Sequence, residues 1–212
     1  MALTPKTGAD IIADFETQVD DMTELSTEEE YMVLDRVYRR ILSAKDWLFL
    51  MKPLALTTDG TDRITLPTDF GFLVESGQYS NRYLDAQYPH VIFVGPNAQP
   101  YYYINQLDRQ QYANQDGYFY IDLVNMKIVF TKAPSSGLAV TGDYSYVPDA
   151  ITDTTSPVIP AQFHDIFPYG MYIDDLMIQM FDKNKAFIQE NGIFFNQRLN
   201  DLKAWNDKFI II

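Results

Sequence analysis

The sequence predicts an α+β fold, with helices at both ends of the chain and a β-rich middle. Apolar residues recur at helical spacing in the first and last quarters, whereas from residue 54 the period becomes that of strands. A segment rich in Pro, Ser, Thr and Asp at 148–159 reads as a linker between the middle and the last quarter. The predicted domains are therefore a helical domain from residues 1–53 and 160–212, and a β-rich insertion at 54–147.

The composition fits one folded core and excludes several kinds of site. Hydrophobic residues make up 47% and charged residues 21% of the 212 residues, as in globular proteins. Because cysteine is absent, disulfide frameworks, zinc ribbons, thiol nucleophiles and iron–sulfur sites are excluded. The net charge of −13 disfavours a grip on nucleic-acid phosphates, although an acidic wall would still let DNA slide past it.

Two features argue against a membrane or secretory role. No run approaches the roughly 18 apolar residues of a membrane helix. Acidic residues at positions 10, 14 and 16 interrupt the region where a signal peptide would have its apolar core. We therefore expect the protein to be made and kept in the cytosol, without a membrane partner.

The N-terminal quarter predicts two helices. A short helix covers residues 8–20, where four apolar residues share one side. Ser26 and Glu29 have the spacing of a capping box, which predicts the start of a second helix. Apolar residues continue at helical spacing to Leu48, so this helix is expected to run to about residue 50 and to stop before Pro53.

The middle of the chain predicts a small sandwich or barrel of short strands. Residues rich in Tyr, Phe, Val and Ile, as strands favour, form the expected strands at 63–66, 82–94, 100–104, 118–123, 127–131 and 138–147. Two of these strands are predicted to pair as a hairpin that turns around Val124, Asn125 and Met126.

The last quarter predicts two further helices. Pro168 and Gly170 fall in the first turns of one, and Asn191-Gly192 separates it from the next. Trp205 lies beside the apolar stripe of the second helix. Phe209 is followed by Ile210, Ile211 and Ile212, an aliphatic run that predicts burial, either in the protein's own core or against a partner.

No catalytic, cofactor or metal site is predicted. The two histidines, His90 and His164, lie in segments of different predicted type without an adjacent serine, so nothing favours a catalytic triad. The glycines are not spaced as a phosphate-binding loop. The chain is therefore interpreted as an assembly component without enzymatic activity.

Three arginines concentrate basic charge on the second predicted helix, at Arg36, Arg39 and Arg40. One interpretation is a solvated face paired with glutamates of the same helix or with the acidic C-terminal helices. The other is an interface that meets an acidic partner.

Two short motifs resemble those of tailed-phage head-to-tail adaptor proteins. The first has the pattern W-x-F and the second L-P-x-D-F, and the residues that carry them are Trp47, Phe49, Leu66, Pro67, Asp69 and Phe70. The order of helix, β-rich insertion, Tyr-rich strand and closing helices is also similar to that family, over about residues 8–209.

The resemblance implies a structural virion protein at the head–tail junction, made in the host cytoplasm. Its helical ends would form one bundle that carries the β-rich insertion. Copies would form a ring, usually dodecameric, between the portal and the tail or neck proteins, with DNA passing through the lumen without specific binding. The residues implied to dock on the portal are Trp205, Phe209, Ile210, Ile211 and Ile212.

The aromatic middle of the chain leaves two hypotheses open. Its tyrosines Tyr101, Tyr102 and Tyr103 are candidates for the contact between ring subunits, because aromatic residues are enriched in interfaces. Alternatively, the chain is a tail or baseplate protein whose β domain binds a glycan by stacking on these rings.

Overall fold

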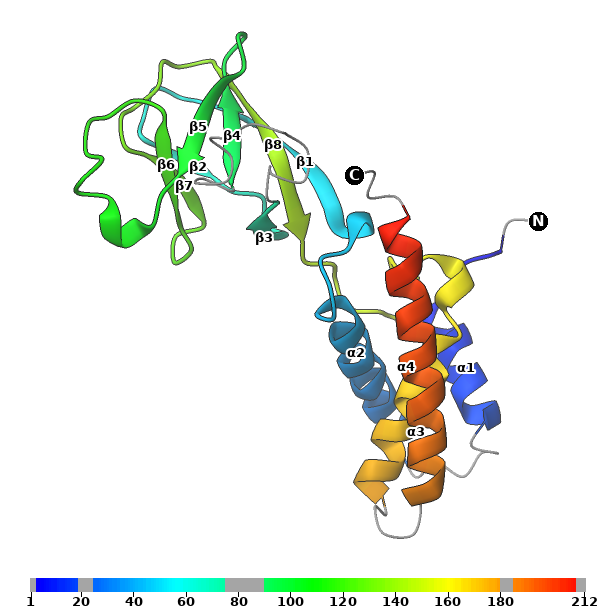
Figure 1. Cartoon of the computed structure of the whole chain (residues 1–212). Coiled ribbons are helices and arrows are strands. Elements are labelled where there is room, and N and C mark those ends of the chain that lie inside the picture. Colours follow the sequence, from blue (N-terminus) through cyan, green and yellow to red (C-terminus); the bar gives the residue numbers. More distant parts are fainter. Residues whose placement is uncertain (1–2, 19–24, 75–89, 180–184, 209–212) are drawn as a thin grey trace. The chain divides into compact units, whose positions relative to one another are not determined.

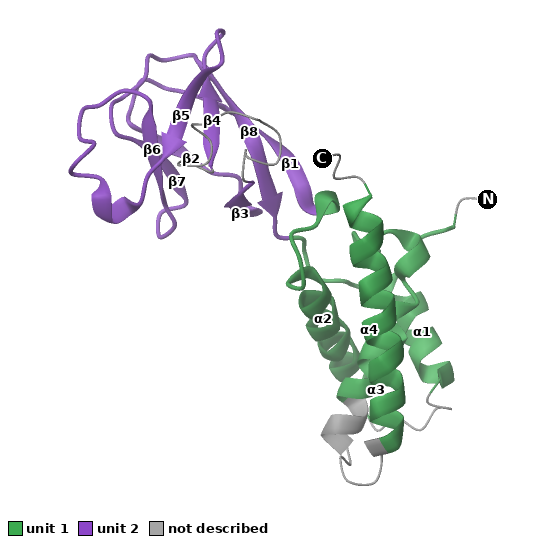
Figure 2. Ribbon diagram, viewed as in Figure 1, with its two compact units in different colours: residues 1–49, 148–211 green, residues 50–147, 212 purple. Residues whose placement is uncertain are grey.

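The computed structural model describes residues 3–18, 25–74, 90–179 and 185–208 (Figure 1). These residues fall into two compact units (Figure 2). The first unit, called the helical unit, combines the chain up to Phe49 with the chain from Pro148 onward. The second, called the β unit, holds Leu50–Val147. The fold is α+β, as the sequence predicts.

The described residues of the helical unit form four α-helices. They are α1 (Gly8–Gln18), α2 (Thr27–Leu42), α3 (Ile166–Gln179) and α4 (Lys185–Asp207), with a short 3-10 helix η4 (Ala161–Phe163) before α3. α1 and α2 contact each other and both contact α3, and α4 packs along α3. Fully buried side chains from α1, α2, α3 and α4 form the core between them, among them Phe15, Val37, Phe167 and Leu202.

Helix α2 begins as predicted but ends earlier. The Ser26 hydroxyl accepts from the Glu29 N–H at 3.4 Å and the Glu29 carboxylate accepts from the Ser26 N–H at 2.8 Å, which confirms the capping box. The prediction of a helix to about residue 50 is wrong, because α2 ends at Leu42. The reason is Trp47, whose indole N–H donates to the carbonyl oxygens of Ile41 and Leu42 at 3.0 and 3.1 Å and so closes the helix end.

The C-terminal helices also differ from the prediction. α4 runs without a break through Asn191 and Gly192, so the predicted separation there is wrong. A single glycine destabilises a helix by only about 1 kcal/mol relative to alanine. The helical residues on both sides of Gly192 are stable enough for the helix to continue through it. Pro168 and Gly170 do lie in the first turns of α3.

Gly170 lets α3 approach its neighbours closely. A Cβ atom at this position would lie 2.5 Å from Cγ1 of Val37 in α2 and 3.0 Å from Cε2 of Phe195 in α4. Both distances are shorter than van der Waals contact, so only glycine fits between these two side chains without displacing them.

The segment between the β unit and η4 lies against the start of α1. The backbone N–H groups of Gly8 and Ala9 donate to the carbonyl oxygens of Thr155 and Asp153, at 3.0 and 3.3 Å. Two of the first four N–H groups of α1, which have no partner within the helix, are satisfied in this way.

Outside the undescribed residues 75–89, the β unit forms one nearly closed, barrel-like sheet of eight strands. The strands are β1 (Met51–Thr57), β2 (Arg63–Thr65), β3 (Phe70–Leu73), β4 (Val91–Val94), β5 (Gln99–Tyr103), β6 (Tyr118–Asp122), β7 (Lys127–Phe130) and β8 (Ala139–Tyr146). Their order is β1-β8-β4-β5-β6-β7-β2, and β3 also pairs with β8. Side chains from these strands meet in one core that includes Leu54, Ile92, Phe119, Ile128 and Val140.

The strand predictions succeed where the alternation of residues is clear. The predicted hairpin is confirmed: β6 and β7 pair from Asp122 and Lys127 outward, and Met126 takes a positive φ of 51° in the turn. The predicted strand at 82–94 is found as β4 at 91–94, and residues 75–89 lie outside the described residues. Strand β1 was missed because it contains Pro53, which lacks an N–H, but β1 is bonded in the described sheet only to β8.

Candidate functional site

The residues of the L-P-x-D-F motif join three strands of the β unit. The Asp69 carboxylate accepts from Lys52 Nζ of β1 at 2.7 Å and from the Tyr144 hydroxyl of β8 at 3.0 Å. The ring of Phe70 in β3 stacks on Tyr144 with centroids 5.7 Å apart. Lys52 Nζ also lies 3.7 Å from the centroid of the Tyr146 ring. The motif therefore makes a structural joint between β1, β3 and β8.

The charges at this joint stabilise one another. The hydrogen bond from Lys52 lowers the pKa of Asp69, and the same bond raises the pKa of Lys52. Burial raises the pKa of Tyr144, and the adjacent Asp69 raises it further. Each group therefore keeps its ordinary protonation state at neutral pH. A residue that transfers protons near pH 7 needs a pKa close to 7, and these shifts move the pKa values away from 7.

The other two residues of this motif set the turn that leads to Asp69. Leu66 is buried and its N–H donates to the carbonyl oxygen of Met126 at 2.9 Å. The Pro67 carbonyl oxygen accepts from the Phe70 N–H at 3.1 Å.

The W-x-F motif fixes the end of α4 to the segment after α2. Trp47 is 1% exposed, and its ring stacks on Phe49 with centroids 5.3 Å apart. Between them, the Leu48 N–H donates to Oδ1 of the buried Asn206 in α4 at 2.9 Å. An ion pair between Lys45 and the next residue of α4, Asp207, joins the same two segments.

The candidates for portal docking begin at this helix end. Trp205 is half-buried and its ring lies edge-on to Phe163 of η4, with centroids 6.0 Å apart. The predicted docking residues Phe209, Ile210, Ile211 and Ile212 lie outside the described residues. The last described turn of α4 is therefore held in place up to the point where the apolar run starts.

The three arginines of α2 all have partners within the helical unit. Arg40 donates to both oxygens of Asp174 in α3, at 2.7 and 2.9 Å, and Arg36 lies 3.8 Å from the same carboxylate. Arg39 pairs with Asp35 at 3.3 Å and donates to the Pro148 carbonyl oxygen at 2.9 Å. Arg36 is 53% exposed and keeps the most freedom to meet a partner.

The three tyrosines of β5 differ in position. Tyr101 is 4% exposed, its hydroxyl donates to Asp116 at 2.7 Å, and burial raises its pKa to about 12. Its side chain therefore belongs to the core and is not available as a surface contact. Tyr102 and Tyr103 are half-buried, and the Tyr103 ring contacts His90 and Phe119 edge-on. No exposed platform of three stacked rings results, so no observation favours the glycan-binding hypothesis.

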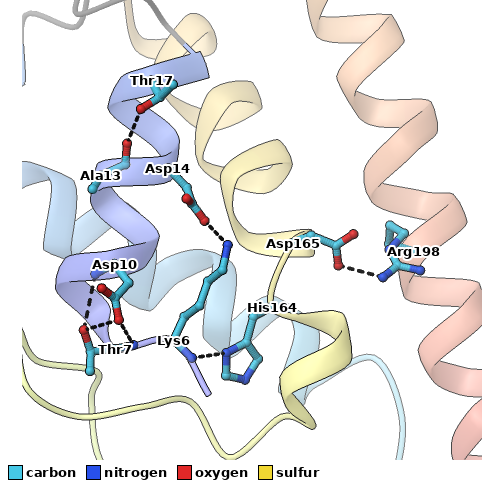
Figure 3. Close-up of polar contacts among 9 residues, drawn as sticks. All are labelled: Lys6, Thr7, Asp10, Ala13, Asp14, Thr17, His164, Asp165 and Arg198. Carbon is cyan, nitrogen blue, oxygen red and sulfur yellow. Dashed lines mark hydrogen bonds and ion pairs between the residues drawn. The ribbon is translucent and has the colours of Figure 1, made fainter. Parts of the chain in front are cut away.

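The second histidine has a structural position in the helical unit (Figure 3). His164 is 1% exposed, accepts at Nδ1 from the Lys6 N–H at 3.1 Å, and donates from Nε2 to the Ile159 carbonyl oxygen at 2.7 Å. Burial lowers its pKa. Ion pairs of Lys6 with Asp14 and of Arg198 with Asp165 lie on either side. His164 thus connects the segment before α1 to the start of α3.

The described residues offer no centre for metal chemistry. Among residues 3–18, 25–74, 90–179 and 185–208, no three His, Cys, Asp or Glu side chains gather as metal ligands would. Within the same ranges no helix is both long and apolar enough to cross a bilayer.

Comparison with known protein families gives a match over nearly the whole chain. The model of the SU10 adaptor protein family matches residues 6–208. The chain belongs to this family. A search of curated proteins found no match.

Membership in this adaptor family agrees with the resemblance carried by the two motifs. The family is one of phage head-to-tail adaptors, so the chain is a phage structural protein that works with portal and tail components in the virion. A structural adaptor also accounts for motif residues that hold strands and helix ends together.

Proposed function

We propose that copies of this adaptor form a ring, dodecameric in the virion, between the portal and the tail. The ring extends the DNA channel and offers the surface to which the tail attaches. The observation that carries the proposal is the family match over residues 6–208. The chain carries 29 acidic against 16 basic residues, which suits a lumen that DNA crosses without being held.

In this proposal the two parts of the chain have separate roles. The helical unit forms one bundle from both chain ends at the portal side. The β unit is its insertion and begins at Leu50, earlier than the predicted boundary at residue 54, and residues 148–159 link it to the closing helices. The contacts of α1 and α2 with α3, and of α3 with α4, support a bundle built from both chain ends. The ring contacts draw on the exposed Arg36 and on Tyr102 and Tyr103.

The tail that follows α4 docks on the portal. Its four residues, Phe209–Ile212, are all apolar, and the turn before them is anchored through Asn206 and Asp207. Trp205, half-buried at this helix end, forms the base of the docking segment. Because every subunit of a ring would supply one tail, engagement of the first raises the effective concentration of the rest.

Electron microscopy of the purified chain mixed with portal protein from the same phage tests this function. We expect rings on the portal end at both low and high salt, and mostly free monomers when the portal is omitted at low salt. Mutual repulsion of copies with a charge of −13 opposes ring closure without a template. Portal particles without added density under all conditions would contradict the proposal.

A further inference from the structure

The β unit carries an apolar groove of about 190 Å³ beside β3. Side chains from three strands and from the residues next to them line it, chiefly Phe70, Phe72, His90, Tyr103, Ile121 and Leu123. Two of these are well exposed, Phe72 at 46% and Leu123 at 64%. The described lining contains no Asp, Glu, Lys or Arg, so the groove suits an apolar occupant.

One polar atom of the groove finds no partner among the residues that the structure describes. His90 Nδ1 is buried and makes no hydrogen bond to any of them, and the imidazole and the Tyr103 ring lie edge-to-face with centroids 5.7 Å apart. A buried nitrogen without a partner carries the cost of its lost hydration. The groove is therefore complementary to a group that is mostly apolar but brings one hydrogen-bonding function.

Elsewhere in the β unit, one leucine side chain is almost fully exposed to solvent. Leu107 lies in the 3-10 helix η3 (Gln106–Asp108) and is 87% exposed. Its N–H donates to Asn105 Oδ1 at 2.9 Å, and the Asp108 N–H donates to the Asn105 carbonyl oxygen at 2.9 Å. The turn is thus fixed before any contact forms, which lowers the entropy lost on binding.

We propose that Leu107 of one copy inserts into the groove of the neighbouring copy, an inference that rests on the proposed ring. Apolar cavities of about 150 Å³ hold a benzene molecule, so a groove of about 190 Å³ has room for a leucine side chain. The amide of the adjacent Gln106 both donates and accepts, so it can pair with His90 Nδ1 in either tautomer. Because the inserted turn and the groove are different surfaces, the contact repeats from copy to copy.

Charge opposes contact between copies less at the β unit than at the helical unit. The segments of the helical unit, residues 1–49 and 148–212, contain 20 acidic and 10 basic residues, whereas residues 50–147 contain 9 and 6. The turn that carries Leu107 has one acid and one base beside it, Asp108 and Arg109. Two copies that meet through their β units therefore experience the least mutual repulsion.

The absence of cysteine allows a direct test by cross-linking. A double variant with Leu107→Cys and Phe72→Cys is assembled on the portal and treated with a short bismaleimide. We expect a ladder of dimers, trimers and larger species in a denaturing gel, at least tenfold above either single variant. Mixing the two single-variant chains should give dimers only, because each chain then supplies one half of the contact.

The matched control pairs Phe72→Cys with Leu3→Cys, since Leu3 is also exposed, at 64%, but lies in the helical unit. Rings seen by microscopy without a ladder above this control would overturn the Leu107 contact and leave the proposed function standing. Dimers alone from the double variant would overturn it in favour of a two-fold contact. If the unmodified chain forms no rings on the portal, the proposed function is contradicted, and the Leu107 contact, which rests on it, is contradicted as well.

A second measurement needs no cross-linking. Leu107→Asp should reduce ring assembly on the portal at least tenfold without changing the melting temperature, because the side chain makes little contact within its own chain. Leu3→Asp should leave assembly unchanged. Normal assembly of Leu107→Asp would overturn the contact.

Discussion

The Arg40 guanidinium in α2 donates through one nitrogen to both carboxylate oxygens of Asp174 in α3. Asp174 is 5% exposed, whereas Arg40 is 41% exposed. The carboxylate has therefore lost most of its water, and Arg40 supplies much of what replaces it. This pair connects residues 134 positions apart in the chain and fixes α3 against α2.

Replacement of Arg40 by methionine should destabilise the protein by about 1.5 to 3 kcal/mol, the range for hydrogen bonds to charged groups. Of the basic partners among the described residues, Asp174 would keep Arg36, which lies 3.8 Å away. Chemical denaturation measures the loss. The control is Arg63→Met, which removes an exposed pair with Asp62 and should cost about 0 to 1 kcal/mol. Equal losses in both variants would contradict a special role for Arg40.

Two glycine-to-alanine changes should have opposite effects. Gly170→Ala places a Cβ 2.5 Å from Val37 Cγ1 and should destabilise the protein by about 1 to 3 kcal/mol through overpacking. Gly192→Ala in α4 meets no atom within 4 Å and should stabilise it by about 0.5 to 1 kcal/mol, because alanine is the better helix former. Urea unfolding of both variants gives the comparison, and a neutral Gly170→Ala would show that the helices can move apart freely.

Acid should loosen the attachment of the segment before α1. Burial lowers the pKa of His164 below its ordinary value of 6.5, so its contribution to stability is complete above pH 6.5 and declines as the pH falls below it. Carboxylates with lowered pKa, such as Asp10 and Asp69, lose their contribution only nearer their ordinary value of 3.8. The window from about pH 6.5 to 5 therefore reports mainly on histidine.

His164→Gln should flatten the decline of melting temperature in this window, because the glutamine amide can accept from Lys6 and donate to Ile159 without titrating. Lys6, paired with Asp14, and Asp165, paired with Arg198, are charged groups near the imidazole and remain in place in this variant. An unchanged pH profile in His164→Gln would assign the decline to other groups.

Removal of Phe209–Ile212 should abolish portal binding and leave the melting temperature nearly constant. Burial of four large apolar side chains yields about 6 to 12 kcal/mol gross, against about 4 to 8 kcal/mol for ordering four residues of backbone. Co-sedimentation with portal protein and a thermal melt measure the two effects. A large fall in melting temperature would instead place the tail in the protein's own core.

Local signals predicted the fold best where one short pattern decides the structure. The capping box at Ser26 and the alternation in β6 and β7 need only neighbouring residues, and both were predicted. The end of α2 was missed because Leu48 continues the helical spacing, while the ring that closes the helix belongs to Trp47, five residues past the last helical residue. Nothing in the local pattern marks that ring as a capping group.

The candidate site depends on pairs that sequence spacing does not reveal. Asp69 and Phe70 were found through the motif, but their partner Tyr144 comes from a strand 75 residues away. The bond between Asn206 and Leu48 spans 158 residues, and no local pattern marks the two as partners. The groove beside β3 is built from four separate segments, so no single window of sequence contains it.

Met51 at the start of β1 pairs with Ser145 near the end of β8, so the chain enters and leaves the β unit at neighbouring points. A segment with adjacent ends can be removed, replaced or enlarged while the flanking helices need only a short connection between them. The β unit can therefore change in length or sequence while the positions at which it joins the helical unit's chain stay the same.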